Sequence, residues 1–186
     1  MAKTYSTTTL SLGTEATDFT LMDTVTHKSI NLFSHTQDRP FVLAFICNHC
    51  PYVVHIRKVL TRVFKELLDQ GVCCVAISSN DATAYPEDGP EKMHLLALAE
   101  RFSFPYLYDA EQSVAKTYQA ACTPEFYLFN ESRKLVYHGQ FDSSRPGNGL
   151  PVTGEDLKKA CEEMLEGKPV FSEQVPSMGC NIKWNM

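Results

Sequence analysis

The chain has 186 residues and a formal net charge of -5, and it contains no dense run of lysine and arginine. Apolar residues make up 44% of it and charged residues 21%, the balance of a globular domain with a substantial core. This composition argues against nucleic acid and anionic membranes as partners, and no apolar run approaches the roughly 18 residues of a membrane span. We expect a single domain, residues 1–186, in the cytoplasm.

The first half of the chain reads as a hairpin followed by alternating strands and helices. Alternating apolar residues around a polar turn predict a β-hairpin over residues 18–32. The apolar run 39–46 predicts a strand that is buried on both faces. From Pro51 to Gly71, apolar residues recur at steps of three and four, which predicts a helix, and residues 72–78 predict a second buried strand.

The second half continues the alternation and ends in a polar tail, residues 167–186. We expect this tail to pack on the domain through Ile182 and Trp184, because large apolar side chains are seldom left in water. Thr153 and Asp156 match a capping box at the start of the last helix. The predicted elements here are helices over 91–102, 111–120 and 153–167 and strands over 124–130 and 133–139.

The order of these elements predicts the fold class. Strand-helix-strand connections produce parallel neighbours, whereas hairpins produce antiparallel ones. We therefore expect an α/β fold with a central mixed β-sheet flanked by helices, an N-terminal β-hairpin and a C-terminal tail.

The chemistry of the chain centres on its cysteines. Seven cysteines are an odd number in a chain too large to need disulfide staples, so reactive or buried thiols are expected. Cys47 and Cys50 lie where a buried strand meets the first turn of a helix, with Pro51 suited to that turn. A thiolate there meets unpaired N–H groups and the positive end of the helix dipole, and its partner can close a disulfide. His49 adds a switchable positive charge beside the pair.

Two other interpretations of this motif stay open at this point. Both cysteines could be ordinary core residues. Cys47, His49 and Cys50 could instead bind zinc or copper, but a structural zinc site needs four ligands, usually as two spaced pairs. A second pair is missing, because the adjacent Cys73 and Cys74 point to opposite faces of a strand and read as core residues.

Seven stretches spread over nearly the whole chain carry a resemblance to known proteins: "DFTLMD", "FICNHCPYV", "ISSNDATAYPEDGPEKM", "FPYLYD", "ACTPEFYLFN", "LVYHGQFDSSRPGNG" and "GCNIKW". With these stretches the chain resembles the thioredoxin superfamily, and within it the peroxiredoxin-like group related to the alkyl hydroperoxide reductase and thiol-specific antioxidant proteins, or redoxins. The resemblance implies a thioredoxin-like fold.

The resemblance also implies roles for individual residues. Cys47 would be the exposed nucleophile and Cys50 the resolving thiol. Pro124 would be a cis-proline that faces the pair, and it would leave the backbone of Thr123 free to pair with an extended substrate segment. Beside these two residues, Asn48 and Pro51 are the other expected substrate-binding positions.

Three departures from the relatives bear on the reaction. Peroxiredoxins carry Pro-x-x-x-Thr-x-x-Cys before their reactive thiol, and with Cys50 in the cysteine position the other two places hold Leu43 and Cys47. No arginine matches their thiolate-stabilising residue by motif, although Arg133 and Arg145 lie in suitable loops. The buried acid of thioredoxins is replaced by Phe41, so His49, solvent or another residue must handle the proton.

The sequence therefore supports three functions. The first is a thiol-disulfide oxidoreductase that acts on protein or small-molecule disulfides and thiols, without a cofactor, and is recycled by a reductant such as a thioredoxin or glutathione system. The second is a thiol peroxidase that works through Cys50 or Cys47. The third is a copper- or zinc-binding protein without turnover. Cys122, Cys180 and Asn80 are candidate accessory residues, with packing as the alternative for each cysteine.

Overall fold

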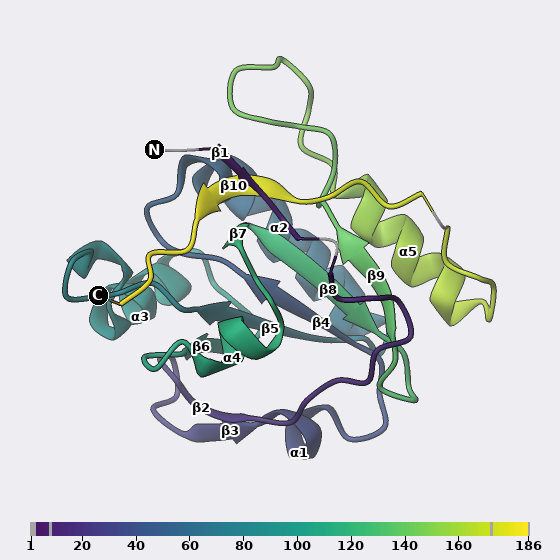
Figure 1. Ribbon diagram of the computed structural model, residues 1–186, viewed down its shortest axis with the longest axis horizontal. Coiled ribbons are helices and arrows are strands. Elements are labelled where there is room, and N and C mark those ends of the chain that lie inside the picture. The colour runs from purple at the N-terminus through teal and green to yellow at the C-terminus, as the bar shows by residue number, and fades with distance from the viewer. Residues whose placement is uncertain (1–2, 8, 172, 186) are drawn as a thin grey trace.

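The computed structural model describes residues 3–7, 9–171 and 173–185 (Figure 1). Its centre is a seven-stranded mixed sheet, which confirms the fold class that the chain order predicts. In spatial order the strands are β3 (Ser29–Asn31), β2 (Thr20–Asp23), β6 (Tyr106–Tyr108), β5 (Cys73–Ser78), β4 (Phe41–Phe45), β8 (Glu125–Phe129) and β9 (Leu135–Gly139).

The middle of this sheet is buried on both faces. β4 runs parallel to β5 and antiparallel to β8, so both of its edges are paired. Because side chains alternate along a strand, Val42 and Ala44 point into one core while Phe41, Leu43 and Phe45 point into the other. A continuous apolar run is what such a doubly covered strand requires.

Helices cover both faces, as expected. α2 begins at Pro51 and ends just before Gly71, whose φ of +88° is a conformation that glycine adopts without strain. The helices whose buried side chains join the first core are α2 (Pro51–Asp69), α3 (Pro90–Ala99) and α5 (Glu155–Leu165). Those that join the second core are α1 (Leu32–Thr36) and α4 (Ser113–Thr117).

A second, three-stranded sheet lies beside the first. It has the order β1 (Lys3–Tyr5), β10 (Met178–Asn181) and β7 (Cys122–Thr123), and all of its pairs are antiparallel. Figure 1 shows β10, near the end of the chain, running beside β1 from its start. The expected tail therefore packs on the domain as a strand. Ile182 is buried as predicted, but Trp184 is 41% exposed, with the Lys116 ammonium 5.9 Å from the centre of its ring.

The predicted elements differ from the structure in two respects. The capping box at α5 is absent, because the N-cap is Gly154 with φ of +68° and Thr153 Oγ1 accepts only from the Glu155 N–H. The Asp156 carboxylate accepts from Gln140 Nε2 instead. Several short elements, including β1, β6, β7 and β10, were also not expected, since two to four residues give too few positions for a periodic pattern.

Candidate functional site

The cysteine pair lies at the carboxyl end of β4, where the chain enters α2. Cys50 is the N-cap of α2 and Pro51 is its first residue, so the strand-to-helix junction is where the sequence predicts it. Both cysteines are free thiols. The expected exposure of Cys47 is wrong, because its exposed fraction is 1% and Cys50 is completely buried.

The surroundings of Cys50 favour a thiolate. The pKa of Cys50 is lowered to about 5 in spite of its burial. The Cys47 thiol is the largest cause, and the Cys180 thiol, the Val53 N–H of the first helical turn and the Cys180 N–H add to it. Cys50 makes no side-chain capping hydrogen bond. When Cys50 is protonated, it donates to the carbonyl oxygen of Thr123 at 3.1 Å.

Cys47 has the opposite tendency. Its role as donor to Cys50 raises the pKa of the Cys47 thiol well above its ordinary value, and burial and the Asp88 carboxylate raise it further. Its sulfur also lies 3.4 Å from Thr123 Oγ1, which favours the thiolate and offsets part of this shift. These opposite directions favour a single proton on the pair, with the thiolate at Cys50.

Asp88 is a further candidate site residue, which the sequence did not reveal. It is completely buried in the 3-10 turn Pro86–Asp88, and its Oδ1 accepts from the backbone N–H groups of Asn48 at 2.8 Å and His49 at 3.3 Å. Its Oδ2 accepts from Asn80 Nδ2 at 2.7 Å. A buried carboxylate therefore stands beside the pair, although Phe41 occupies the position where thioredoxins carry theirs. Asn48 and Asp88 are 40 positions apart, so no local spacing could connect them.

His49 contacts Asp88. Its Nδ1 lies 2.6 Å from Asp88 Oδ2 but makes no aligned hydrogen bond. The ring stacks on Tyr85 at 5.6 Å with an interplanar angle of 3°. One ligand atom each of Cys47, His49 and Asp88 lies within 4.8 Å of the others, and these three donors could hold a metal ion.

The cis bond expected at Thr123–Pro124 is present. Thr123 contacts both cysteines, through its hydroxyl to Cys47 and its carbonyl to Cys50, so the proline loop faces the pair. The expected free backbone at Thr123 is wrong. β7 pairs with β10, with Cys180 opposite Thr123 and Asn181 opposite Cys122, so the chain's own tail occupies this edge.

The other predicted site residues, Asn48, Pro51 and Asn80, have different environments. Asn48 is held by hydrogen bonds within the domain, since its Nδ2 donates to Glu87 O and its Oδ1 accepts from Tyr106 Oη. Pro51 is exposed at the start of α2. Asn80 joins Asp88 to the tail, because its Oδ1 accepts from the Lys183 N–H at 2.9 Å.

The two accessory cysteines differ in their environments. Cys122 is completely buried, and its thiol points toward Pro124 O and the Glu125 carboxylate. Burial, and then Glu125, raise the pKa of Cys122. Cys180 is 3% exposed, belongs to the same buried cluster as Cys50, and pairs with Thr123, which contacts Cys50. Of the two, Cys180 is therefore the one placed beside Cys50.

Neither candidate arginine is bound at the pair. Arg133 lies over the Phe33 ring at 4.0 Å and faces Asp38, while Arg145 donates to the carbonyls of Asp142 and Ser144. Both are engaged in loops of their own.

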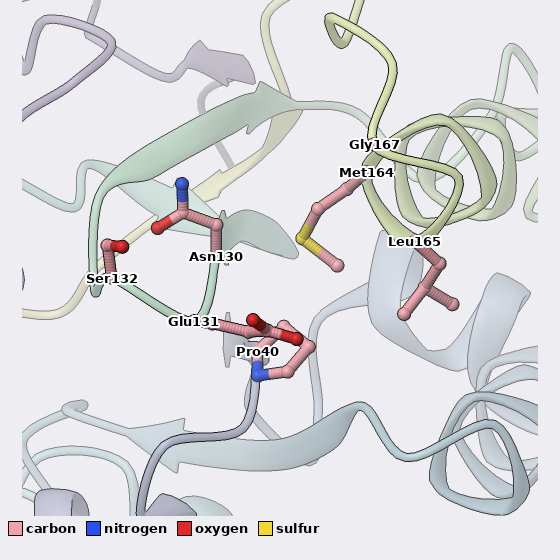
Figure 2. Close-up of a pocket in the computed structure, with 7 residues that line it drawn as sticks. All are labelled: Pro40, Asn130, Glu131, Ser132, Met164, Leu165 and Gly167. Atoms are coloured by element: carbon pink, nitrogen blue, oxygen red, sulfur yellow. The ribbon is translucent and has the colours of Figure 1, made fainter.

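The cavity in Figure 2 lies at the opposite end of β4 from the cysteines. It has a volume of about 300 Å³, and Pro40, which precedes β4, forms part of it. Figure 2 shows the loop after β8 facing the end of α5 across this space. None of its lining residues belongs to the cysteine motif, so we do not assign the chemistry to it. They are Pro40, Asn130, Glu131, Ser132, Met164, Leu165 and Gly167.

A comparison with known protein families identifies the family of the chain. Residues 12–138 match the model of the AhpC/TSA family, which is more than half of the chain, so the chain belongs to that family. The resemblance seen in the sequence is confirmed. No curated protein matches the chain.

Two solved structures are similar over almost the entire chain. An uncharacterized conserved protein from Geobacillus kaustophilus is 47% identical with a TM-score of 0.96, covering 100% of this chain and 97% of its own. A hypothetical protein from Sinorhizobium meliloti 1021 is 49% identical with a TM-score of 0.94, covering 98% of each chain. Peroxidoxin BcpB from Mycobacterium tuberculosis is 21% identical with a TM-score of 0.62, covering 84% of this chain and 96% of its own, and shares the fold.

Among the described residues, no helix has the length and apolarity needed to cross a bilayer.

Proposed function

We propose that the chain is a thiol-disulfide oxidoreductase in which Cys47 and Cys50 alternate between dithiol and disulfide. One observation carries this proposal: Cys47 and Cys50 meet at the N-terminus of α2 and both contact Thr123 of the cis-proline loop. In this setting the Cys47 thiol, above all other causes, lowers the pKa of Cys50 to about 5. Such a sulfur is a thiolate at neutral pH, and the thiolate is the nucleophile in disulfide exchange.

The two cysteines take successive steps. The Cys50 thiolate attacks one sulfur of a substrate disulfide and releases the other as a thiolate. Cys47 then loses its proton and attacks Cys50 Sγ, which forms the Cys47–Cys50 disulfide and releases the second substrate thiol. Asp88, whose carboxylate lies within 4.8 Å of Cys47 Sγ, is the proposed acceptor of that proton. This assignment reverses the roles that the sequence implied.

The substrate that fits best is a low-molecular-weight disulfide. Because β10 pairs with β7, an extended protein segment has no free backbone at Thr123 to join. A small disulfide needs no such edge. A thioredoxin or glutathione system in the cytoplasm would return the pair to the dithiol.

A thiol peroxidase is the second candidate, favoured by the lowered pKa of Cys50. Cys50 would attack a hydroperoxide, break its O–O bond and become a sulfenic acid, and Cys47 would condense with it and release water. It ranks second because Cys47 occupies the place of the activating threonine, and Arg133 and Arg145 are bound elsewhere.

Metal binding by Cys47, His49 and Asp88 rests only on the proximity of their ligand atoms. Purification under reducing conditions followed by elemental analysis would test it, and stoichiometric zinc or copper would favour this function over turnover.

Single-cysteine variants test the main proposal. The reduced protein is mixed with oxidised glutathione, and released glutathione is counted. Wild type should release two equivalents, Cys47→Ser should still release the first, and Cys50→Ser should release none. If Cys50→Ser reacted and Cys47→Ser did not, the nucleophile would be Cys47. A wild type that released nothing, or that consumed hydroperoxide far faster than disulfide, would overturn disulfide exchange as the main reaction.

A further inference from the structure

The C-terminal strand is held directly against the proline loop. β10 lies between β1 and β7, and its Gly179 approaches the carbonyl group of Thr123 so closely that a Cβ there would be 1.9 Å from the oxygen and 2.6 Å from the carbon. Both atoms are backbone, so they cannot swing aside. Only glycine permits this approach, and it brings the next residue, Cys180, opposite Thr123.

The residues after β10 fix the strand in place. The Ile182 N–H donates to Ala121 O at 3.1 Å, and the Lys183 N–H donates to Asn80 Oδ1 at 2.9 Å. Gln112 Nε2 donates to Lys183 O at 2.8 Å. Since Asn80 also donates to Asp88, one side chain connects the tail to the carboxylate beside the cysteine pair.

This anchoring places a third sulfur at the reacting pair. Cys180 pairs with Thr123, whose carbonyl oxygen lies 3.1 Å from Cys50 Sγ, and both cysteines belong to the same buried cluster of side chains. Burial, and then the neighbouring Cys50, raise the pKa of Cys180 to about 12. Cys122, also in the second sheet, instead directs its thiol to Pro124 O and Glu125. Cys180 is therefore the cysteine of the tail that a reaction at Cys50 can use.

We propose that Cys180 is a third redox-active thiol, which attacks Cys50 Sγ once Cys50 is oxidised and forms a Cys50–Cys180 disulfide. The proposal rests on the function assigned above, because it needs Cys50 to enter a mixed disulfide. Cys180 gains the bond to Cys50, the leaving sulfur departs with the electron pair, and the Cys180 proton passes to that leaving sulfur. When the leaving sulfur is Cys47, one disulfide replaces another and no further oxidant is required. When it is a bound glutathione, Cys180 completes the reduction of the substrate without Cys47.

The second equivalent of glutathione tests this step. Full-length, reduced Cys47→Ser is mixed with oxidised glutathione, and the release of both equivalents is followed in time. We expect the first equivalent from attack by Cys50 and the second from attack by Cys180. In Cys47→Ser/Cys180→Ser, the second release should slow by at least about 100-fold, because a sulfur held in place is replaced by attack from free thiol in solution. The adduct on Cys50 should then persist in the mass spectrum.

Cys47→Ser/Cys122→Ser is the matched control, since it removes another buried thiol of the same sheet, and it should release both equivalents. Wild type provides a test that needs no variant. After oxidation, acid quench and alkylation, a link between the peptides that contain Cys50 and Cys180 should appear beside the internal Cys47–Cys50 link. Retention of the adduct in Cys47→Ser itself, together with a free Cys180 in oxidised wild type, would overturn the proposal. Failure of the first release would instead count against the proposed function.

Discussion

The core cysteines Cys74 and Cys161 and the site cysteine Cys50 form two groups that are equally buried but differ in the acidity of their thiols. Cys74 in β5 and Cys161 in α5 lie in the core, and burial raises the pKa of both thiols, that of Cys161 to about 12. Cys50 is as buried as either, yet its pKa falls to about 5. Burial alone therefore does not make a thiol inert.

The difference comes from which donors are unpaired. Inside a strand or a helix the N–H groups are already bonded to carbonyls, so the Cys74 thiol finds only the carbonyls of Phe64 and Val72, at 3.8 and 3.9 Å. At the start of α2 the first N–H groups have no partner within the helix, and the thiols of Cys47 and Cys180 add to them. A negative charge is stabilised at such a place.

The largest effect that we expect from this difference is a loss of activity when Cys50 is replaced. Cys50→Ser should lower the rate of disulfide reduction by at least about 1000-fold, because it removes the nucleophile rather than a supporting group. Cys161→Ala, which removes a core thiol, should stay within about twofold of wild type at a temperature where both are folded. Turnover of oxidised glutathione with a coupled reductant measures both. A comparable loss in Cys161→Ala would show that the two groups are not distinct.

Asp88→Asn should have a smaller effect on the same rate, about tenfold. The carboxylate holds the pKa of Cys47 up, so its removal should lower the pKa of Cys47 and change the resolving step rather than the first attack. Alkylation of Cys47 against pH in the Cys50→Ser background measures the first effect. Glu87→Gln, an exposed neighbour in the same turn, is the control. Identical pH profiles in Asp88→Asn and its parent would contradict the proposed influence of the carboxylate.

The sequence revealed the parts of the molecule that depend on local pattern. The doubly buried strand β4, the long helix α2 and the hairpin of β8 and β9 follow from runs and periods that lie within a few residues. The junction of Cys47 and Cys50 with α2 was visible for the same reason. The cis bond at Pro124 came from the resemblance, not from local pattern.

The features that were missed or wrong depend on distant pairings. Asp88 reaches the pair from a short turn far along the chain, and β10 is a strand only because β1 and β7 accept it on either side. The tail is held by Ile182, which is buried and whose N–H donates to Ala121 O, while Trp184 remains 41% exposed. The exposure expected of Cys47 was wrong for a related reason, since Thr123 and Asp88, both distant in the chain, lie against it.

The stability of the reduced protein should depend on pH through Cys50. Its pKa is about 5 in the folded state, below the value of roughly 8.5 for a thiol in an unfolded chain. A lowered pKa stabilises the folded state fully above the unfolded value, and this contribution is lost as the pH falls from about 9 toward about 5. Chemical unfolding of reduced wild type and Cys50→Ser, with a chelator present, should therefore give free energies of unfolding that converge as the pH falls through this window. A constant difference between the two proteins would mean that Cys50 is protonated when folded.

The smallest expected effect concerns the core group itself. If Cys161 is only a small apolar side chain, Cys161→Ala should cost about 1 kcal/mol of unfolding free energy, because it removes one buried atom from a packed site. Cys161→Ser keeps the size of the side chain but introduces a hydroxyl into the core. On a helix this hydroxyl can bond to the carbonyl four residues earlier, that of Leu157, so the further cost should be limited to about 1 kcal/mol. Urea unfolding of the two variants would give the order wild type, alanine, serine. Serine equal to or above wild type would show that polarity at this position is tolerated, and that Cys161 is not in the core for its apolar character.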